Sequence, residues 1–77
     1  MDNQAKVIEI ISRVTGEKVE IGPEESLFDS GILDSFALTD VIAGVEKEFS
    51  IKVPDSDLTP RKFNTISRIV SYVESRG

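Results

Sequence analysis

Three stripes of apolar residues at helical spacing constrain the fold of this chain more than any other feature. Each stripe places apolar side chains at positions i, i+3, i+4 and i+7, which lie on one face of an α-helix. We therefore predict three long amphipathic helices that bury these faces against one another. The stripes are Val7-Ile10-Ile11-Val14, then Leu38-Val41-Ile42-Val45 continued by Phe49, and then Ile66-Ile69-Val70-Val73.

Residues that favour helix ends flank each stripe. Gly16 follows the first stripe and suits the end of a helix. Pro60 after Thr59 predicts a short extra helical turn over residues 59–63, because proline is favoured at the first helical position. Side chains that can accept a hydrogen bond from the first turn precede each helix. The candidates are Asp2 or Asn3, then Asp34 or Ser35, then Asn64 or Thr65.

The segment between the first two predicted helices, residues 15–35, is long for a connection. Loops of about twenty residues are usually functional or disordered. This one is too apolar to be disordered, so we expect it to pack across the helices. We predict one all-α domain over residues 1–77: a small bundle of three long helices plus one short helix, with a long loop between the first two. The apolar residues of the loop are Val19, Ile21, Leu27, Phe28, Ile32 and Leu33.

The composition argues against an autonomous enzyme. The chain has no histidine and no cysteine, so a serine nucleophile lacks an imidazole base and no Cys–His pair can form. Nucleotide-binding glycine motifs are also absent. We predict no catalytic residue and no metal site. The lack of cysteine, of an apolar stretch of about 20 residues and of a signal peptide leads us to expect a cytoplasmic protein without a membrane span.

Acidic residues are concentrated in the middle of the chain. Residues 20–57 hold ten acids and two bases, whereas the rest of the chain has a formal charge of +3. An acidic surface repels nucleic acid and attracts proteins with basic patches. A three-helix DNA-binding domain would need a basic recognition helix, but the second predicted helix carries three acids and one lysine. We therefore expect protein partners and no nucleic acid.

Ser35 stands at the first turn of the second predicted helix. The N-terminus of a helix favours anions through its dipole and its unpaired N–H groups, so a phosphodiester on Ser35 would be stabilised there. The alternative from the residues alone is that Asp34-Ser35 is a helix cap and nothing more.

The surroundings of Ser35 resemble the acyl carrier protein family, and the resemblance covers essentially the whole chain. It implies that Ser35, preceded by Asp34, receives 4′-phosphopantetheine from coenzyme A through a phosphopantetheinyl transferase. The matching motifs are Leu27-Phe28-x-x-Gly31-x-Leu33-Asp34-Ser35, Val45-Glu46-Lys47-Glu48-Phe49, Ile51-x-Val53-Pro54 and Asn64-Thr65.

The resemblance also implies a mechanism in which partner enzymes supply the chemistry. The carrier holds an acyl or aminoacyl group as a thioester and presents it to a loading ligase and to downstream transferases or synthases. A monomer is expected. The residues that we expect to dock partners are Phe36, Leu38, Asp40, Glu46 and Glu48, together with Asp34.

The site departs from two subtypes of this family. Fatty-acid carriers usually have Asp-Ser-Leu, whereas Phe36 follows Ser35 here, and peptide-synthetase carriers usually have Gly-Gly-x-Ser. The tail is similar to D-alanyl carrier proteins of teichoic acid modification, on Val53-Pro54, Asp57, Phe63 and Asn64-Thr65. A specialised stand-alone carrier is the leading interpretation. Its cargo stays open between an aminoacyl group and a short or modified acyl chain, and fatty acid or secondary metabolite biosynthesis remains possible.

Cargo chemistry affects where the cargo lies. A long acyl chain gains about 0.8 kcal/mol for each buried CH₂ group, which favours insertion into the core. A charged aminoacyl group loses hydration on burial and should stay outside. The competing function is an unmodified acidic helical module that binds proteins. The residues that would line an acyl pocket, or form ordinary core, are Phe28, Leu38, Ile42, Val45, Ile51 and Ile66.

Overall fold

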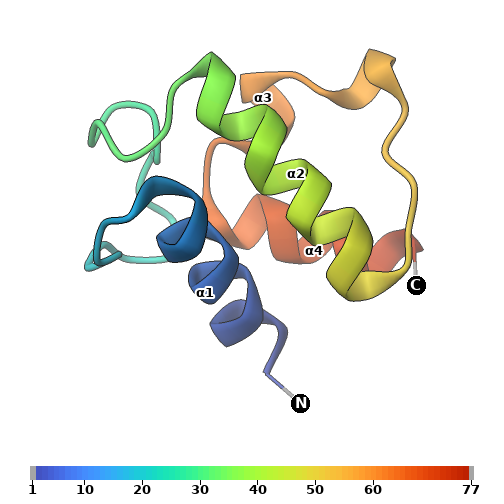
Figure 1. Ribbon diagram of the computed structural model, residues 1–77, viewed down its shortest axis with the longest axis horizontal. Coiled ribbons are helices and arrows are strands. Elements are labelled where there is room, and N and C mark those ends of the chain that lie inside the picture. The colour runs from blue at the N-terminus through green and yellow to red at the C-terminus, as the bar shows by residue number, and fades with distance from the viewer. Residues whose placement is uncertain (1, 77) are drawn as a thin grey trace.

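The computed structural model describes residues 2–76, and this part of the chain contains four α-helices and no strand (Figure 1). This confirms the predicted all-α fold, with a long loop between the first two helices. A 3₁₀ turn at Asp55–Asp57, which the sequence analysis did not predict, lies between α2 and α3. The helices are α1 (Asn3–Thr15), α2 (Ser35–Phe49), α3 (Pro60–Phe63) and α4 (Ile66–Arg76).

The helix ends follow the predicted capping chemistry with one exception. The carboxylate of Asp2 accepts hydrogen bonds from two N–H groups in the first turn of α1, and Gly16 ends that helix with φ +72°. The hydroxyl of Thr65 accepts a 3.0 Å bond from the first turn of α4. Thr59 precedes Pro60 as expected, but its side chain makes no capping bond. Local chemistry thus sets where these helices begin.

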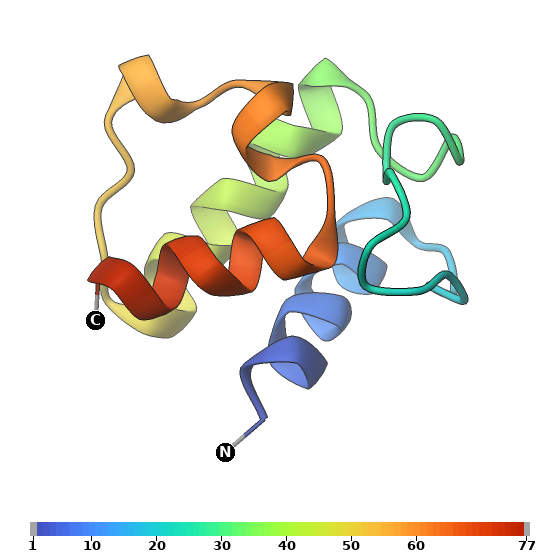
Figure 2. The same cartoon turned by 180° about the vertical axis from the view of Figure 1, so that it is seen from behind.

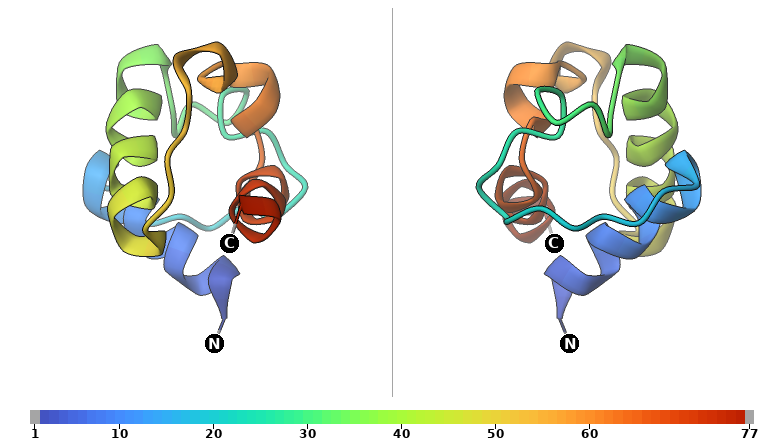
Figure 3. Two further views of the ribbon diagram at one scale, coloured as in Figure 1. Left: turned by 90° about the vertical axis from the view of Figure 1, so that its right-hand side faces the viewer. Right: turned by 90° about the vertical axis from the view of Figure 1, so that its left-hand side faces the viewer.

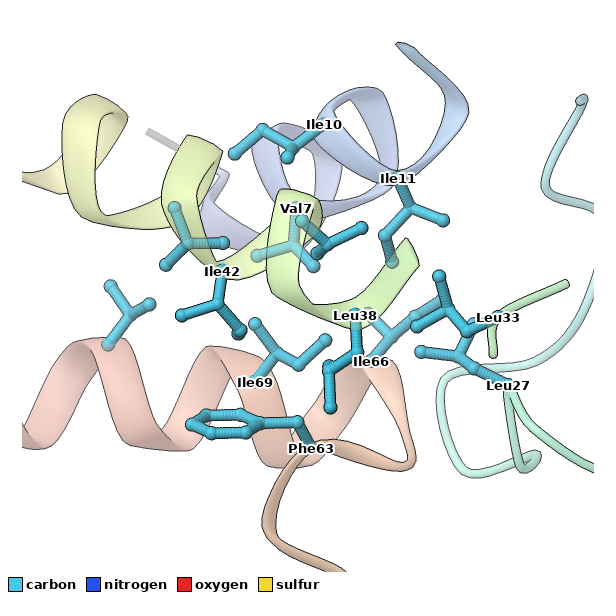
Figure 4. Packing of buried hydrophobic residues seen from close by; sticks show 13 residues of the cluster. Val7, Ile10, Ile11, Leu27, Leu33, Leu38, Ile42, Phe63, Ile66 and Ile69 are labelled. Atoms are coloured by element: carbon cyan, nitrogen blue, oxygen red, sulfur yellow. The ribbon is translucent and has the colours of Figure 1, made fainter. Parts of the chain in front are cut away.

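The three apolar stripes meet in one core (Figure 4). Each long helix contributes its predicted face, and Phe63 of α3 closes the core from one side. Of the six residues considered for an acyl pocket, Phe28 and Ile51 are half-buried against this core. The other four are packed within it, at 0–3% exposure: Leu38, Ile42, Val45 and Ile66.

Helix α1 packs against both α2 and α4, which lie on opposite sides of the molecule (Figure 3). The contact between α1 and α2 is close at Gly44, where an added Cβ would lie 2.9 Å from Cγ2 of Ile10. Since real Cβ atoms do not approach that closely, a glycine at this position allows the two helices to reach their observed separation.

Asp57 ties the segment between α2 and α3 to the C-terminal half of α4. Its carboxylate accepts hydrogen bonds from Lys62 at 2.6 Å, from the Tyr72 hydroxyl at 2.8 Å and from Arg76 at 3.0 Å. The hydrogen bonds from Lys62 and Tyr72 hold the pKa of Asp57 below its usual value. Burial, and then the bond to Asp57, raise the pKa of Tyr72. The ionised carboxylate is therefore the form that the fold favours.

We predict that Asp57 makes stability fall in acid. Because the pKa of Asp57 is lowered in the folded state, its contribution is complete above the ordinary aspartate pKa of about 3.9 and is lost as the pH falls below it. Asp57→Asn should be less stable than the parent at neutral pH and should lose less stability on acidification. Urea unfolding followed by circular dichroism across this range measures both effects.

Asp55→Asn is the matched control for this prediction. Asp55 lies in the same 3₁₀ turn, it is exposed, and its carboxylate has no bonded partner among residues 2–76. An Asp57→Asn variant with the same acid sensitivity as the parent would contradict the assigned role.

Candidate functional site

The start of α2 is positioned by the turn over residues 27–33, which is held at both ends by the core. The side chain of Leu27 is fully buried and that of Leu33 is 4% exposed. The N–H of Leu27 donates a 2.7 Å bond to the carbonyl of Asn64, and its carbonyl accepts bonds from the N–H groups of Ile32 and Leu33 at 3.1 and 3.0 Å. The chain therefore enters α2 from a fixed point.

Two further features shape the loop before α2. Gly31 has φ +84°, a conformation that strains residues with a side chain, and it reverses the chain just before the helix. Farther back, Ser67 of α4 donates its N–H to the carbonyl of Pro23 at 3.0 Å and its hydroxyl to Glu24 at 2.6 Å. The loop therefore packs across the molecule, as predicted, and lies beside the C-terminal end of α1 and the N-terminal end of α4 (Figure 2).

Asp34, of the two predicted candidates, caps α2. Its Oδ1 atom accepts a 2.8 Å hydrogen bond from the N–H of Ala37. Ser35 is the first helical residue and is exposed, and its hydroxyl makes no hydrogen bond to another described residue. The N–H groups of Ser35 and Phe36 likewise have no protein acceptor within residues 2–76. Because Asp34 supplies the cap, the Ser35 hydroxyl stays free for chemistry.

A shallow groove of about 420 Å³ lies beside Ser35, lined by its neighbours Asp34 and Phe36 and not by Ser35 itself. Its wall combines the start of α2 with the end of α1 and the residues after it, and three of its side chains are carboxylates. The contribution from Val14, Thr15 and Glu17 was missed by the sequence analysis, because nothing in their spacing relates them to a serine twenty positions away. The lining residues are Val14, Thr15, Glu17, Gly31, Ile32, Asp34, Phe36, Ala37 and Asp40.

The residues expected to dock partners do not all share one surface. Phe36 is 85% exposed, and Asp40 is exposed beside it on the same groove. The prediction that Leu38 docks partners was wrong, because its side chain is 3% exposed and belongs to the core. The error arose because a position near Ser35 along the chain faces inward one turn into the helix.

The two glutamates near the end of α2 already have partners within the fold. The carboxylate of Glu46 is half-buried and accepts a 2.7 Å bond from the N–H of Val53. Glu48 lies 3.6 Å from the ammonium of Lys6, which also sits 5.7 Å from the ring centre of Phe49. Glu46 therefore fixes the start of the α2–α3 connection, while Glu48 remains exposed.

Residues 2–76 hold neither a metal-binding cluster nor a membrane-spanning helix. No group of three or more acidic side chains there is arranged to hold a metal ion. None of the helices in that range combines the length and hydropathy needed to cross a membrane.

Comparison with known proteins identifies the family. Residues 5–73 match the family described as "Phosphopantetheine attachment site". The chain is 33% identical over 75 residues to the D-alanyl carrier protein of Lactobacillus acidophilus, and the aligned region covers 97% of this chain and 95% of that relative. It is 41% identical over 73 residues to the D-alanyl carrier protein of Streptococcus sanguinis, with coverage of 95% and 92%. The chain therefore belongs to the acyl carrier protein family, whose members hold their cargo on covalently attached 4′-phosphopantetheine.

Proposed function

We propose that Ser35 is the attachment site for phosphopantetheine and that this chain carries D-alanine as a thioester on that group. The observation on which the proposal rests is the division of roles at the start of α2. Asp34 caps the helix, so the hydroxyl of Ser35 is exposed and makes no bond to the protein. Without that division, Ser35 would be the cap and its hydroxyl would be engaged.

The start of α2 fits the phosphodiester of the prosthetic group. The N–H groups of Ser35 and Phe36 have no acceptor within residues 2–76, and the positive end of the helix dipole favours an anion there. When bound, phosphopantetheine supplies a terminal thiol that holds cargo as a thioester. The chain has no histidine to deprotonate Ser35, so attachment requires a separate transferase. We infer from this that the carrier itself is not an enzyme.

The choice of D-alanine rests on the names of the relatives and on the surroundings of Ser35. The relatives are D-alanyl carrier proteins. The groove beside Ser35 contains the carboxylates of Glu17, Asp34 and Asp40. With the arm lying back along this groove, these carboxylates would favour a cargo with a free ammonium group over an anionic one. Such a cargo would lose hydration in the core and should stay outside it.

Partner enzymes would dock on the face of α2 around Phe36, Asp40 and Glu48. An exposed aromatic ring beside carboxylates suits a basic surface with a small apolar pocket, because charge steers the encounter and the ring anchors it. The transferase and an aminoacyl ligase are the partners this chemistry requires. We propose that the chain acts as a single-domain monomer in the cytoplasm, where the absence of cysteine is unexceptional.

Ser35→Ala should abolish modification. After incubation with coenzyme A, magnesium and a broad-specificity phosphopantetheinyl transferase, intact-protein mass spectrometry should detect one added phosphopantetheine on the parent and none on the variant. Ser30→Ala is the matched control, since Ser30 lies in the preceding turn and bonds to the Leu27 carbonyl. A folded parent that gains no mass would favour an unmodified interaction module instead.

Replacing Asp34 separates its capping role from its charge. Asp34→Ala should lower the free energy of unfolding by about 1 kcal/mol, because it removes the bond to the Ala37 N–H. Asp34→Asn keeps a capping oxygen and should cost much less. Urea unfolding measures both variants. Equal losses in the two would show that the charge of Asp34, and not its cap, stabilises the start of α2.

Phe36→Ala should impair transfer of phosphopantetheine without destabilising the fold. At 85% exposure the ring contributes little to the core, and its loss removes a docking anchor. Steady-state kinetics of the transferase with varied carrier concentration should show a higher KM at an unchanged unfolding midpoint. Leu38→Ala is the contrasting variant, since that buried side chain should alter stability. An unchanged KM for Phe36→Ala would remove this residue from the docking surface.

A further inference from the structure

A second groove is lined mainly by residues of α4. Helix α4 itself lies on the opposite side of the molecule from α2 (Figure 3). Its volume is about 840 Å³, twice that of the groove beside Ser35. Its walls are polar, with hydroxyl groups along α4 and cations at the edges. The lining residues are Glu24, Asp57, Lys62, Ser67, Arg68, Ser71, Tyr72, Ser75 and Arg76.

Positive charge in this groove exceeds what its two acids neutralise. Asp57 is shared by Lys62 and Arg76, which lie 2.6 and 3.0 Å from its carboxylate oxygens. Glu24 accepts the Ser67 hydroxyl and makes no ion pair with a described residue. The two carboxylates balance the charges of Lys62 and Arg76, so the one surplus positive charge in the groove is that of Arg68.

Among the cations that line the groove, Arg68 is the one whose N–H donors have no carboxylate acceptor within residues 2–76. Its side chain has one hydrogen bond, at 3.5 Å to the backbone carbonyl of Arg61. No carboxylate within residues 2–76 lies at ion-pair distance from Arg68 or from the neighbouring Arg61. A guanidinium group has five N–H donors arranged to bind a carboxylate in bidentate fashion. The groove therefore offers donors that the fold does not use.

We propose that the groove over α4 docks an acidic segment of a partner protein. Charge complementarity favours a carboxylate opposite Arg68, and the hydroxyl group of Ser71 can donate to the same segment. Arg61 does not line the groove, but its backbone carbonyl bonds to Arg68, so its charge lies nearby on the chain. Because Ser35 and Phe36 do not line this groove, a protein held there leaves the start of α2 uncovered. The carrier can then be retained through α4 while α2 presents its cargo elsewhere.

A membrane surface fits the same charges less well. The residues that line the groove are polar or charged, whereas binding at a bilayer interface usually combines basic residues with exposed apolar ones. Within residues 2–76 the large hydrophobic residue left exposed is Phe36, which lies on α2.

The test is a titration of the isotopically labelled full chain with a polyglutamate peptide, followed by NMR. Amide shifts should concentrate in residues 67–76 and should weaken with added salt. Arg68→Gln should weaken binding roughly two- to fivefold, and Arg61→Gln combined with it should weaken binding further. Lys47→Gln, which removes an exposed charge from α2, is the matched control and should bind as the parent does.

Three outcomes would overturn the proposal. Shifts confined to α2 would place the interaction on the other face. Equal binding by the parent and the Arg61→Gln/Arg68→Gln variant would exclude these guanidinium groups. Sedimentation with phosphatidylglycerol vesicles that depends on the two arginines, without any response to polyglutamate, would assign the groove to lipid. Ser35→Ala should bind polyglutamate normally, so failure of this proposal is distinguishable from failure of the attachment site.

Discussion

The insertion of Leu27 into the core is the contact on which the functional end of the molecule depends. Its side chain is fully buried, and its backbone bonds join the loop to Asn64 and to the turn that enters α2. A loop without this anchor would leave Asp34 and Ser35 on a mobile connection. Since conformational freedom of the backbone costs about 1–2 kcal/mol per ordered residue, a long loop needs such buried contacts to stay in one conformation.

Stability and function are separated at the start of α2. Asp34 and Leu38 hold the helix in place, one through a hydrogen bond to the first turn and the other through burial. Ser35 and Phe36, which lie between these two residues in the sequence, face solvent and contribute little to the fold. With Ser35 as the proposed attachment site and Phe36 as the proposed docking residue, partners can bind both without disturbing the packing of the core.

The acidic side chains are only partly divided between those exposed to partners and those bonded within the fold. Asp40 is exposed, whereas the carboxylates of Glu46 and Asp57 bond to other parts of the chain. The acidic middle of the sequence therefore overstates the negative surface that a partner meets. Basic side chains of α3 and α4, namely Lys62, Arg68 and Arg76, outnumber the two carboxylates in the groove that they line together.

The sequence by itself determined the helices and the family, and it narrowed the cap of α2 to Asp34 or Ser35, because apolar periodicity and capping chemistry act over a few neighbouring residues. Tertiary structure alone decided which side chains share a surface. Glu17 joins the groove that Asp34 and Phe36 line, through the packing of α1 against α2. Arg68 meets Arg61 only when α3 folds against α4. Such contacts depend on how helices cross, which local spacing does not specify.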